Sequence, residues 1–219
     1  KAAAGKSGGK SAGKKGARGG HGAHAYQTVD VVVVAAHIIT AAQSIVSRNV
    51  RPIDSAVVSL CAMQAGDLGA FSVLPGSATL VGTVRTFDPQ VQEMVEKRLK
   101  ELCNAIALGF GATATVHYER IYPATINTEN EAIFAGDVAE SLLGADHVVR
   151  DLEPSMGAED FSFMLQTKPG AYLRIGQGMG ASGAVLHNSR YDFNDDILSL
   201  GAALHASLIE RAMPLPAAQ

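Results

Sequence analysis

Two histidines in loops are the first candidates for chemistry in this 219-residue sequence. His21 stands in "RGGHGAHAY", residues 18–26, among small residues where neither a buried core nor a stable helix would place an imidazole. His187 stands in "AVLHNSRYDF", residues 184–193, between a predicted strand and a predicted helix. Loops at the carboxyl ends of strands bind ligands in α/β folds. His187 is therefore either a metal ligand or, as for most loop histidines, a solvated side chain, and the motif alone favours the second interpretation.

Charged side chains in two further motifs allow a functional and a structural interpretation each. Arg85, in "GTVRTFD" at 82–88, ends a predicted strand, where a guanidinium could bind a substrate carboxylate through two hydrogen bonds. Spacing alone favours an exposed charge at a strand end. In "SMGAEDF" at 155–161, either Asp160 or Glu159 is expected to cap the short helix that follows. A catalytic zinc site needs three protein ligands, and the sequence contains no HExxH and no H-x-D motif.

Composition limits the kind of protein that could carry these residues. The sequence is 47% hydrophobic but only 5% aromatic, without Trp, which indicates an α/β core built from small residues. Residues 1–20 hold six basic side chains and no acid, so the other 199 residues carry about −9, from 12 basic and 21 acidic side chains. The basic tract has no aromatic residue to stack on a base, which argues against nucleic-acid binding. We interpret residues 1–18 as a low-complexity lead-in.

Cysteine content and hydropathy point to a soluble protein of a reducing compartment. Cys61 and Cys103 are too few and too far apart for a disulfide framework or a C-x-x-C metal site. The most apolar stretch, "VVVVAAHIITAA", is shorter than a membrane span and is interrupted by His37. The sequence predicts a cytoplasmic protein that does not enter a membrane.

The elements that must position these residues follow from hydrophobic periodicity. The first part of the chain predicts two helices and three strands, with one more strand expected before His21. The helices are predicted at 30–47 and 88–111, and the strands at 56–66, 77–87 and 112–122. With the additional strand the order becomes β-α-β-β-α-β, the ferredoxin-like unit.

After residue 122 the pattern changes to alternating helices and strands with few strands. A helix is predicted at about 129–143, a short helix directly after "PSMGAED", and a last helix from about Asn194 to Met213. A strand is predicted at 170–176. Too few strands are present to build a complete α/β sheet. This part of the sequence therefore predicts half of an α/β domain.

Four motifs, taken in order, resemble a known enzyme family. They are "GGHGAHAYQTVD", "FSVLPGSATLVGTVRTFD", "PSMGAEDF" and "LHNSRYDF". Together they resemble the metal-dependent amidohydrolases of the hippurate hydrolase, aminoacylase and auxin-conjugate hydrolase group, which are related to carboxypeptidase G. The resemblance implies a ferredoxin-like lid and dimerisation domain at 19–122. It also implies part of an α/β zinc-exopeptidase-like catalytic domain at 123–219.

The resemblance also implies site residues and a cofactor. His21 matches a lid histidine that stabilises the oxyanion, commonly in the partner subunit's active site. Arg85 and Ser72 match substrate-binding positions, Ser72 standing where relatives usually have Asn, and His187 matches the C-terminal metal ligand. Ala25 and Val31 replace residues that are commonly proline. The full enzyme would hold two divalent ions per chain, zinc or manganese, and the family's first half, with most metal ligands, has no counterpart here.

The implied activity is hydrolysis of the amide bond of small N-acyl amino acids to a carboxylic acid and an amino acid, by a homodimer. Two alternatives remain open. The chain could be a non-catalytic dimerisation fragment that lacks most metal ligands and is inactive alone, or a relative of desuccinylase or dipeptidase type.

Overall fold

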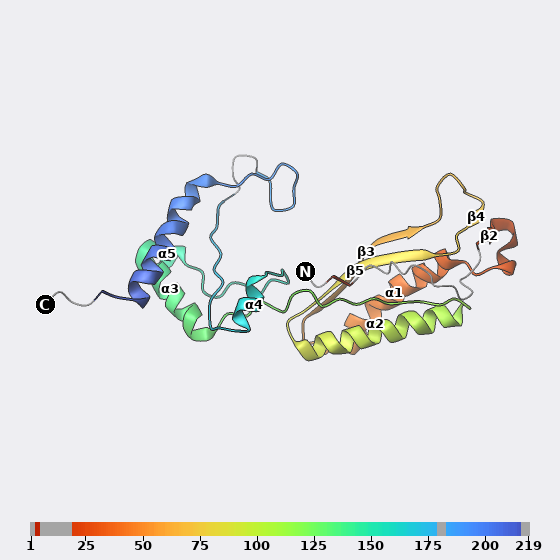
Figure 1. Ribbon diagram of the computed structural model, residues 1–219, viewed down its shortest axis with the longest axis horizontal. Helices are drawn as coiled ribbons and strands as arrows, with labels where there is room; N and C mark the ends of the chain where they lie inside the picture. Colours follow the sequence, from red (N-terminus) through yellow and green to blue (C-terminus); the bar gives the residue numbers. More distant parts are fainter. Residues whose placement is uncertain (1–2, 5–18, 179–182, 216–219) are drawn as a thin grey trace. The chain divides into compact units, whose positions relative to one another are not determined.

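The structure, a computed structural model, describes residues 3–4, 19–178 and 183–215. It divides into two compact units (Figure 1). Unit 1 comprises Lys1–Ala124 and Met156–Glu159, and unit 2 comprises Thr125–Ser155 and Asp160–Gln219. Helices and strands both occur, in agreement with the predicted α/β class.

Unit 1 is built around an antiparallel sheet in the order β1-β5-β3. Its strands are β1 (Ala3–Ala4), β3 (Ala56–Ala65) and β5 (Ala78–Thr86). Val58 lies opposite Val84, and the register shifts between Leu60 and Ala62, so that Cys61 forms an irregularity in β3. The strand expected before His21 is present as β1, which lies in the tract interpreted as a lead-in and pairs with β5.

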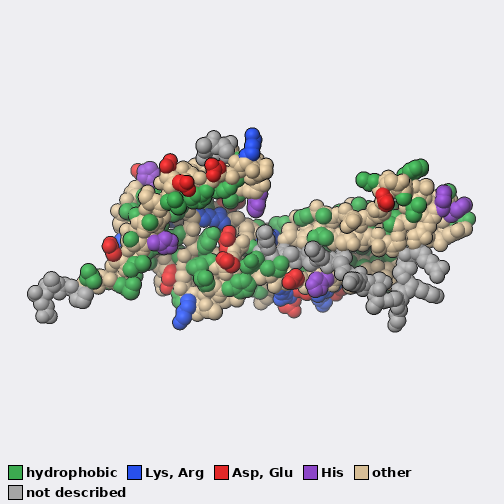
Figure 2. Space-filling view, turned by 45° about the horizontal axis from the view of Figure 1, so that its top comes forward, with side chains coloured by type: hydrophobic (Ala, Val, Ile, Leu, Met, Phe, Trp, Pro, Cys, Tyr) green, Lys and Arg blue, Asp and Glu red, His purple; other side chains and the backbone are tan. Residues whose placement is uncertain are grey.

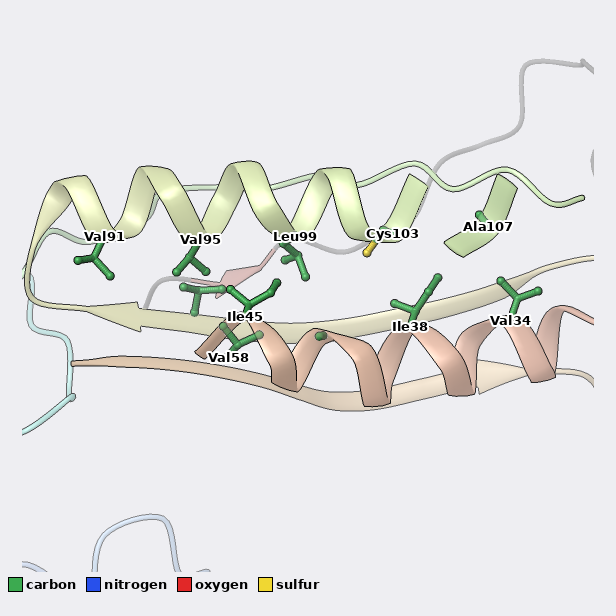
Figure 3. Close-up of a cluster of buried hydrophobic side chains, with 11 residues drawn as sticks. Val34, Ile38, Ile45, Val58, Val91, Val95, Leu99, Cys103 and Ala107 are labelled. Atoms are coloured by element: carbon green, nitrogen blue, oxygen red, sulfur yellow. The ribbon is translucent and has the colours of Figure 1, made fainter. Parts of the chain in front are cut away.

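Two helices cover one face of this sheet, α1 (Val31–Asn49) and α2 (Pro89–Gly109) (Figure 3). Asp30 caps α1, because its carboxylate accepts hydrogen bonds from the amides of Val32 and Val33. Asp88 caps α2 through the amide of Gln90, directly before Pro89 at the first helical position. Both caps stand where the sequence predicted the helices to begin.

The core of unit 1 lies between the helices and the sheet. Ile45 and Val95 are fully buried there, and Cys103 is buried with them. Burial raises the pKa of the Cys103 thiol. Helix α1 is also long and apolar enough to cross a membrane, with a mean hydropathy of 1.6. Its buried face packs into this core, however, which gives the apolar residues a structural role.

The prediction of a strand at 112–122 is wrong. The segment is irregular in backbone pairing, although its alternate residues Ala112, Ala114, Val116 and Tyr118 pack against the core. Arg120 ties it to α2, with Nη2 of Arg120 2.8 Å from Oε2 of Glu96. Burial, with the Glu96 carboxylate, raises the pKa of Tyr118 to about 12. The alternation correctly predicted which side chains are buried, but a strand also requires a partner that continues the backbone hydrogen bonds.

Unit 2 is mainly helical. Its helices are α3 (Glu129–Leu143), α4 (Phe161–Leu165) and α5 (Leu198–Ala212), with 3-10 turns η2 (Ala145–His147) and η3 (Asp195–Ile197). Helix α3 packs on α5, and Arg150 joins the loop after η2 to α3 through Asp137 at 2.7 Å and Glu140 at 2.6 Å. The three helices agree with the sequence prediction.

The strand predicted at 170–176, ahead of the loop with His187, is wrong, because the described residues of unit 2 form no strand. Near residue 172, hydrogen bonds from a side chain take the place of those of a partner strand. Asn127 Oδ1 accepts from the amide of Tyr172 at 2.7 Å, and its Nδ2 donates to the carbonyl of Tyr172 at 3.0 Å. The amide of Thr128 donates to the carbonyl of Gly170 at 3.0 Å. The segment around residue 170 is thus held beside the start of α3 without a partner strand.

Candidate functional site

A short two-stranded ribbon at one end of unit 1 carries His21. Strand β2 (Gly20–His21) pairs antiparallel with β4 (Val73–Leu74), with His21 opposite Val73. The amide of Gly22 donates to the carbonyl of Ser72 at 2.7 Å. The ribbon therefore brings together two of the predicted site residues, His21 and Ser72, which are 51 positions apart in the sequence.

The His21 side chain caps the 3-10 helix η1 (Gly22–Gln27). Its Nδ1 accepts a hydrogen bond from the amide of Ala23 at 3.1 Å, and the side chain is otherwise exposed. A neutral imidazole has one donor and one acceptor nitrogen, so acceptance at Nδ1 assigns the proton to Nε2. His21 thus presents an N–H donor to whatever approaches its exposed edge.

Two further rings lie near His21, and exposed apolar side chains occupy the loop before β4. The His24 ring centroid lies 5.6 Å from that of His21, and Tyr26 lies edge-on to His24 at 6.0 Å. Leu68 and Phe71, in the loop before β4, are almost fully exposed. Figure 2 shows histidine side chains gathered at this end, beside hydrophobic ones. These side chains were not predicted as part of the site, although apolar Leu68 and Phe71 in a Gly-containing loop could have indicated an exposed apolar surface there.

Arg85 lies far from His21 within unit 1. It is half-buried near the end of β5, opposite Val57, and seven residues beyond Ala78 at the start of that strand. At a strand rise of about 3.4 Å per residue, Arg85 lies roughly 24 Å along β5 from its first residue. Since β4 and the ribbon directly precede that first residue, the unit does not bring Arg85 to His21.

His187 lies in a turn of unit 2 with an unusual backbone. Its φ is 69°, and among the described residues no other residue except glycine has a positive φ. The amide of Asn188 donates to the carbonyl of Val185 at 3.1 Å, and the Asn188 side chain accepts from the amide of Arg190 at 2.9 Å. Residues held in this region of φ/ψ space concentrate at functional sites, which makes His187 a candidate independent of its side-chain chemistry.

The described residues do not form a metal site by themselves. Within the described ranges, no group of three His, Cys, Asp or Glu side chains is placed to hold an ion. One exposed histidine does not satisfy the three or four ligands that a zinc ion requires. Asp160 occupies the position before α4 but makes no capping hydrogen bond, so the expected cap from this carboxylate is wrong.

Comparison with known proteins identifies the family. Residues 6–211 match the family described as Peptidase family M20/M25/M40. The chain belongs to this family of hydrolases.

Curated relatives are similar over most of this chain. A hippurate hydrolase of Campylobacter jejuni is 36% identical over 191 residues, covering 87% of this chain and 49% of the relative. An IAA-amino acid hydrolase ILR1-like 4 of Arabidopsis thaliana is 33% identical, covering 89% of this chain and 45% of the relative. The chain therefore spans about half the length of the curated relatives that it matches.

A solved structure supports the same assignment. The crystal structure of the Bacillus subtilis YXEP protein, described as a dinuclear metal-binding peptidase of the M20 family, superposes with a TM-score of 0.64 at 25% identity. The superposition covers 84% of this chain and 46% of the YXEP chain. The resemblance to metal-dependent amidohydrolases seen in the four sequence motifs is thereby confirmed at the level of the family.

Proposed function

We propose that the whole protein is a metal-dependent amidohydrolase that cleaves small N-acyl amino acids to a carboxylic acid and an amino acid. The similarity to a hippurate hydrolase and an IAA-amino acid hydrolase, at 36% and 33% identity, supports this substrate class. We also propose a cytoplasmic homodimer. Unit 1 would be its lid and dimerisation domain, and unit 2 part of its catalytic domain.

The geometry of His21 is the observation that carries the proposal. Hydrolysis of an amide places negative charge on the carbonyl oxygen, and a preorganised N–H donor stabilises that charge. His21 offers Nε2–H from an exposed ribbon, with the ring fixed through Nδ1. Ser72, joined to the same ribbon, would contribute a hydroxyl donor to the bound substrate.

The separation of Arg85 from His21 supports the homodimer. Arg85 would bind the substrate carboxylate through its guanidinium. A small N-acyl amino acid is much shorter than the distance along β5 between the two ends of unit 1, so His21 and Arg85 of one chain would not contact the same molecule. We therefore assign His21 to the active site of one subunit and Arg85 to that of the other.

The cofactor would be two divalent ions per chain, zinc or manganese. The description of the YXEP protein as a dinuclear metal-binding peptidase supports the number of ions, and His187 is the residue of this chain that we assign as a metal ligand. The described residues do not complete such a site, so the remaining ligands must come from elsewhere in the whole protein. Replacement of His187 by Ala should lower the bound metal measured by atomic emission, whereas His205→Ala, on exposed α5 surface, should not. Equal metal content in both variants would contradict the assignment.

Subunit complementation tests the shared active site. In the full-length enzyme, His21→Ala and Arg85→Ala should each reduce kcat/KM for hippurate-like substrates by 10²-fold or more, on the order of one lost transition-state donor. If the two residues act in different subunits, mixing the variants restores one intact site in each mixed dimer, or about a quarter of wild-type activity. No recovery despite proven subunit exchange would contradict the assignment. His24→Ala serves as the control for damage to η1.

The first alternative is a non-catalytic dimerisation module, favoured by the lack of a three-ligand group among the described residues. An intact mass near 22.7 kDa, with no tightly bound ion and no hydrolysis, would support that alternative. The second alternative, a desuccinylase or dipeptidase type, is tested by the substrate panel. Preference for N-succinyl diamino acids or dipeptides over N-benzoyl and N-acetyl amino acids would replace the proposed substrate class.

A further inference from the structure

The backbone amide of Ala23 contacts the one residue of unit 1 to which we assign a role in bond cleavage. We infer that this amide is a positioning group that fixes the Nε2–H tautomer of His21. The inference rests on the proposed function only for its catalytic meaning, because the tautomer itself is a property of unit 1.

The contact has the geometry of a helix N-cap. His21 has φ −76° and ψ 132°, extended backbone, and its Nδ1 lies 3.1 Å from the nitrogen of Ala23, two residues ahead. Asp30 caps α1 in the same way, with a carboxylate oxygen 3.0 Å from the amide two residues ahead. A carboxylate has only acceptors when ionised, whereas an imidazole must choose which nitrogen accepts. Capping therefore selects the tautomer as well as orienting the ring.

The opposite tautomer is incompatible with this contact. With the proton on Nδ1, two N–H groups would face each other and the cap hydrogen bond would be lost. The difference favours the Nε2–H form by several-fold to tenfold, on the order of one hydrogen bond. Only that form of the neutral ring can donate from Nε2, the nitrogen that the cap leaves exposed.

The amide is itself held in place by the ribbon. Gly22, between His21 and Ala23, donates to the carbonyl of Ser72 at 2.7 Å. A Cβ on Gly22 would lie 3.3 Å from that same oxygen, so the approach is close. The turn that presents the Ala23 amide is thus anchored to the chain before β4, and the tautomer depends on the pairing of β2 with β4.

The tautomer is measured directly by NMR of the ring nitrogens. In the 219-residue chain, two-bond ¹H–¹⁵N correlations should show the Nε2–H form of His21 enriched several-fold to tenfold relative to exposed His205 on α5, which should show the average of a solvated imidazole. An averaged pattern for His21, the same as that of His205, would overturn the inference.

A substitution and its matched control test the cause. Ala23→Pro removes the N–H donor and should move His21 towards the averaged pattern. Ala25→Pro places the same residue in the same short helix but leaves the Ala23 amide intact, and should leave the His21 pattern unchanged. An unchanged pattern in Ala23→Pro would overturn the role of the amide, and so would an equal change in both variants.

A measurement on the wild-type chain covers the case in which Ala23→Pro does not fold. Protonation converts Nδ1 to a donor and breaks the cap, so the Ala23 amide resonance should shift with the same midpoint as the His21 ring. The nearby titratable rings are His24 and Tyr26, and His24 is followed by its own signals. An Ala23 amide that follows His24, or does not shift, contradicts the contact.

Activity then separates this inference from the proposed function. In the full-length enzyme, Ala23→Pro should lower kcat several-fold relative to Ala25→Pro with KM little changed, in parallel with the loss of the Nε2–H form. If the NMR result holds but His21→Ala has full activity, the proposed role of His21 fails while the tautomer assignment stands.

Discussion

Unit 1 and unit 2 differ in how their extended segments are held. In unit 1, β3 and β5 share a nine-pair antiparallel register, and two capped helices bury a common core against them. In unit 2, α3 and α5 pack together, but its buried apolar residues are few (Ala135, Val138 and Leu204), and residues 170–176 form no strand. A helix forms its backbone hydrogen bonds internally, whereas a strand forms them only with a partner strand. Helices therefore form in both units, but an extended strand ladder forms only among the described residues of unit 1.

The largest expected effect sharpens the contrast in core size. Ile45→Ala should destabilise unit 1 by about 3 kcal/mol, because Ile45 is fully buried between α1 and α2 and its loss leaves a cavity. Ile53→Ala, at a residue 82% exposed, should change stability by less than about 0.5 kcal/mol. The stability of each variant is measured by urea unfolding, with hydrogen exchange of the amides in each unit as the readout. Similar losses in the two variants would show that the core is not where we place it.

The second effect tests whether unit 2 unfolds separately. Val138→Ala on α3, at a side chain 2% exposed, should lower the stability of unit 2 by about 2 kcal/mol and leave exchange in unit 1 unchanged. Val149→Ala, at 71% exposure, is the matched control. Equal acceleration of exchange throughout both units would break the comparison, since the two would then form one cooperative unit.

A third, smaller effect compares the two helix starts. Asp30→Ala should destabilise α1 by about 1 kcal/mol through loss of its cap. Thr128, before α3, makes no cap; its hydroxyl instead accepts from the amide of Gly170 at 2.9 Å. Thr128→Ala should therefore release the segment around residue 170 with little effect on α3, as read from amide exchange at each site. Fraying of α3 in this variant would contradict the assigned partner.

The smallest effect is a pH dependence of the stability of unit 1. Partial burial acts to raise the pKa of Glu96, but hydrogen bonds from Lys100 and Arg120 outweigh it and lower that pKa below its ordinary 4.5. A lowered folded-state pKa means that the stabilisation is complete above the unfolded-state value and is lost as pH falls through the folded-state value. Glu96→Gln should flatten the loss of stability below pH 4.5, because the glutamine has no carboxylate to protonate. Identical acid profiles of this variant and the unsubstituted chain would contradict the pairing.

The same difference between the units explains what the sequence could predict. Both caps of unit 1, Asp30 and Asp88, were visible as local patterns, and α1, α2 and α3 begin within a residue of the predicted positions. The strands at 56–66 and 77–87 were also correct, because each is the other's neighbour in both sequence and space. The predictions at 112–122 and 170–176 failed because a local apolar pattern does not specify the partner strand that a ladder requires, and at 170–176 Leu173 and Ile175 are exposed as well.

The candidate site was predictable in residue type but not in arrangement. Four motifs singled out His21, Ser72, Arg85 and His187, and their roles stay predictions. The contact between the ribbon strands that joins His21 to Ser72, the Ala23 cap and the positive φ of His187 come from tertiary structure and backbone geometry. No side-chain pattern in the sequence encodes them.

The two cysteines, finally, differ in a way that gives the protein a built-in labelling position. Cys61 is exposed at the irregularity of β3, while Cys103 is buried in the core with a raised pKa. Thiolate is the reactive species, so a maleimide at neutral pH should attach to Cys61 and spare Cys103. A spin label there would report the separation of the β3 strands of two associated copies without any engineered residue.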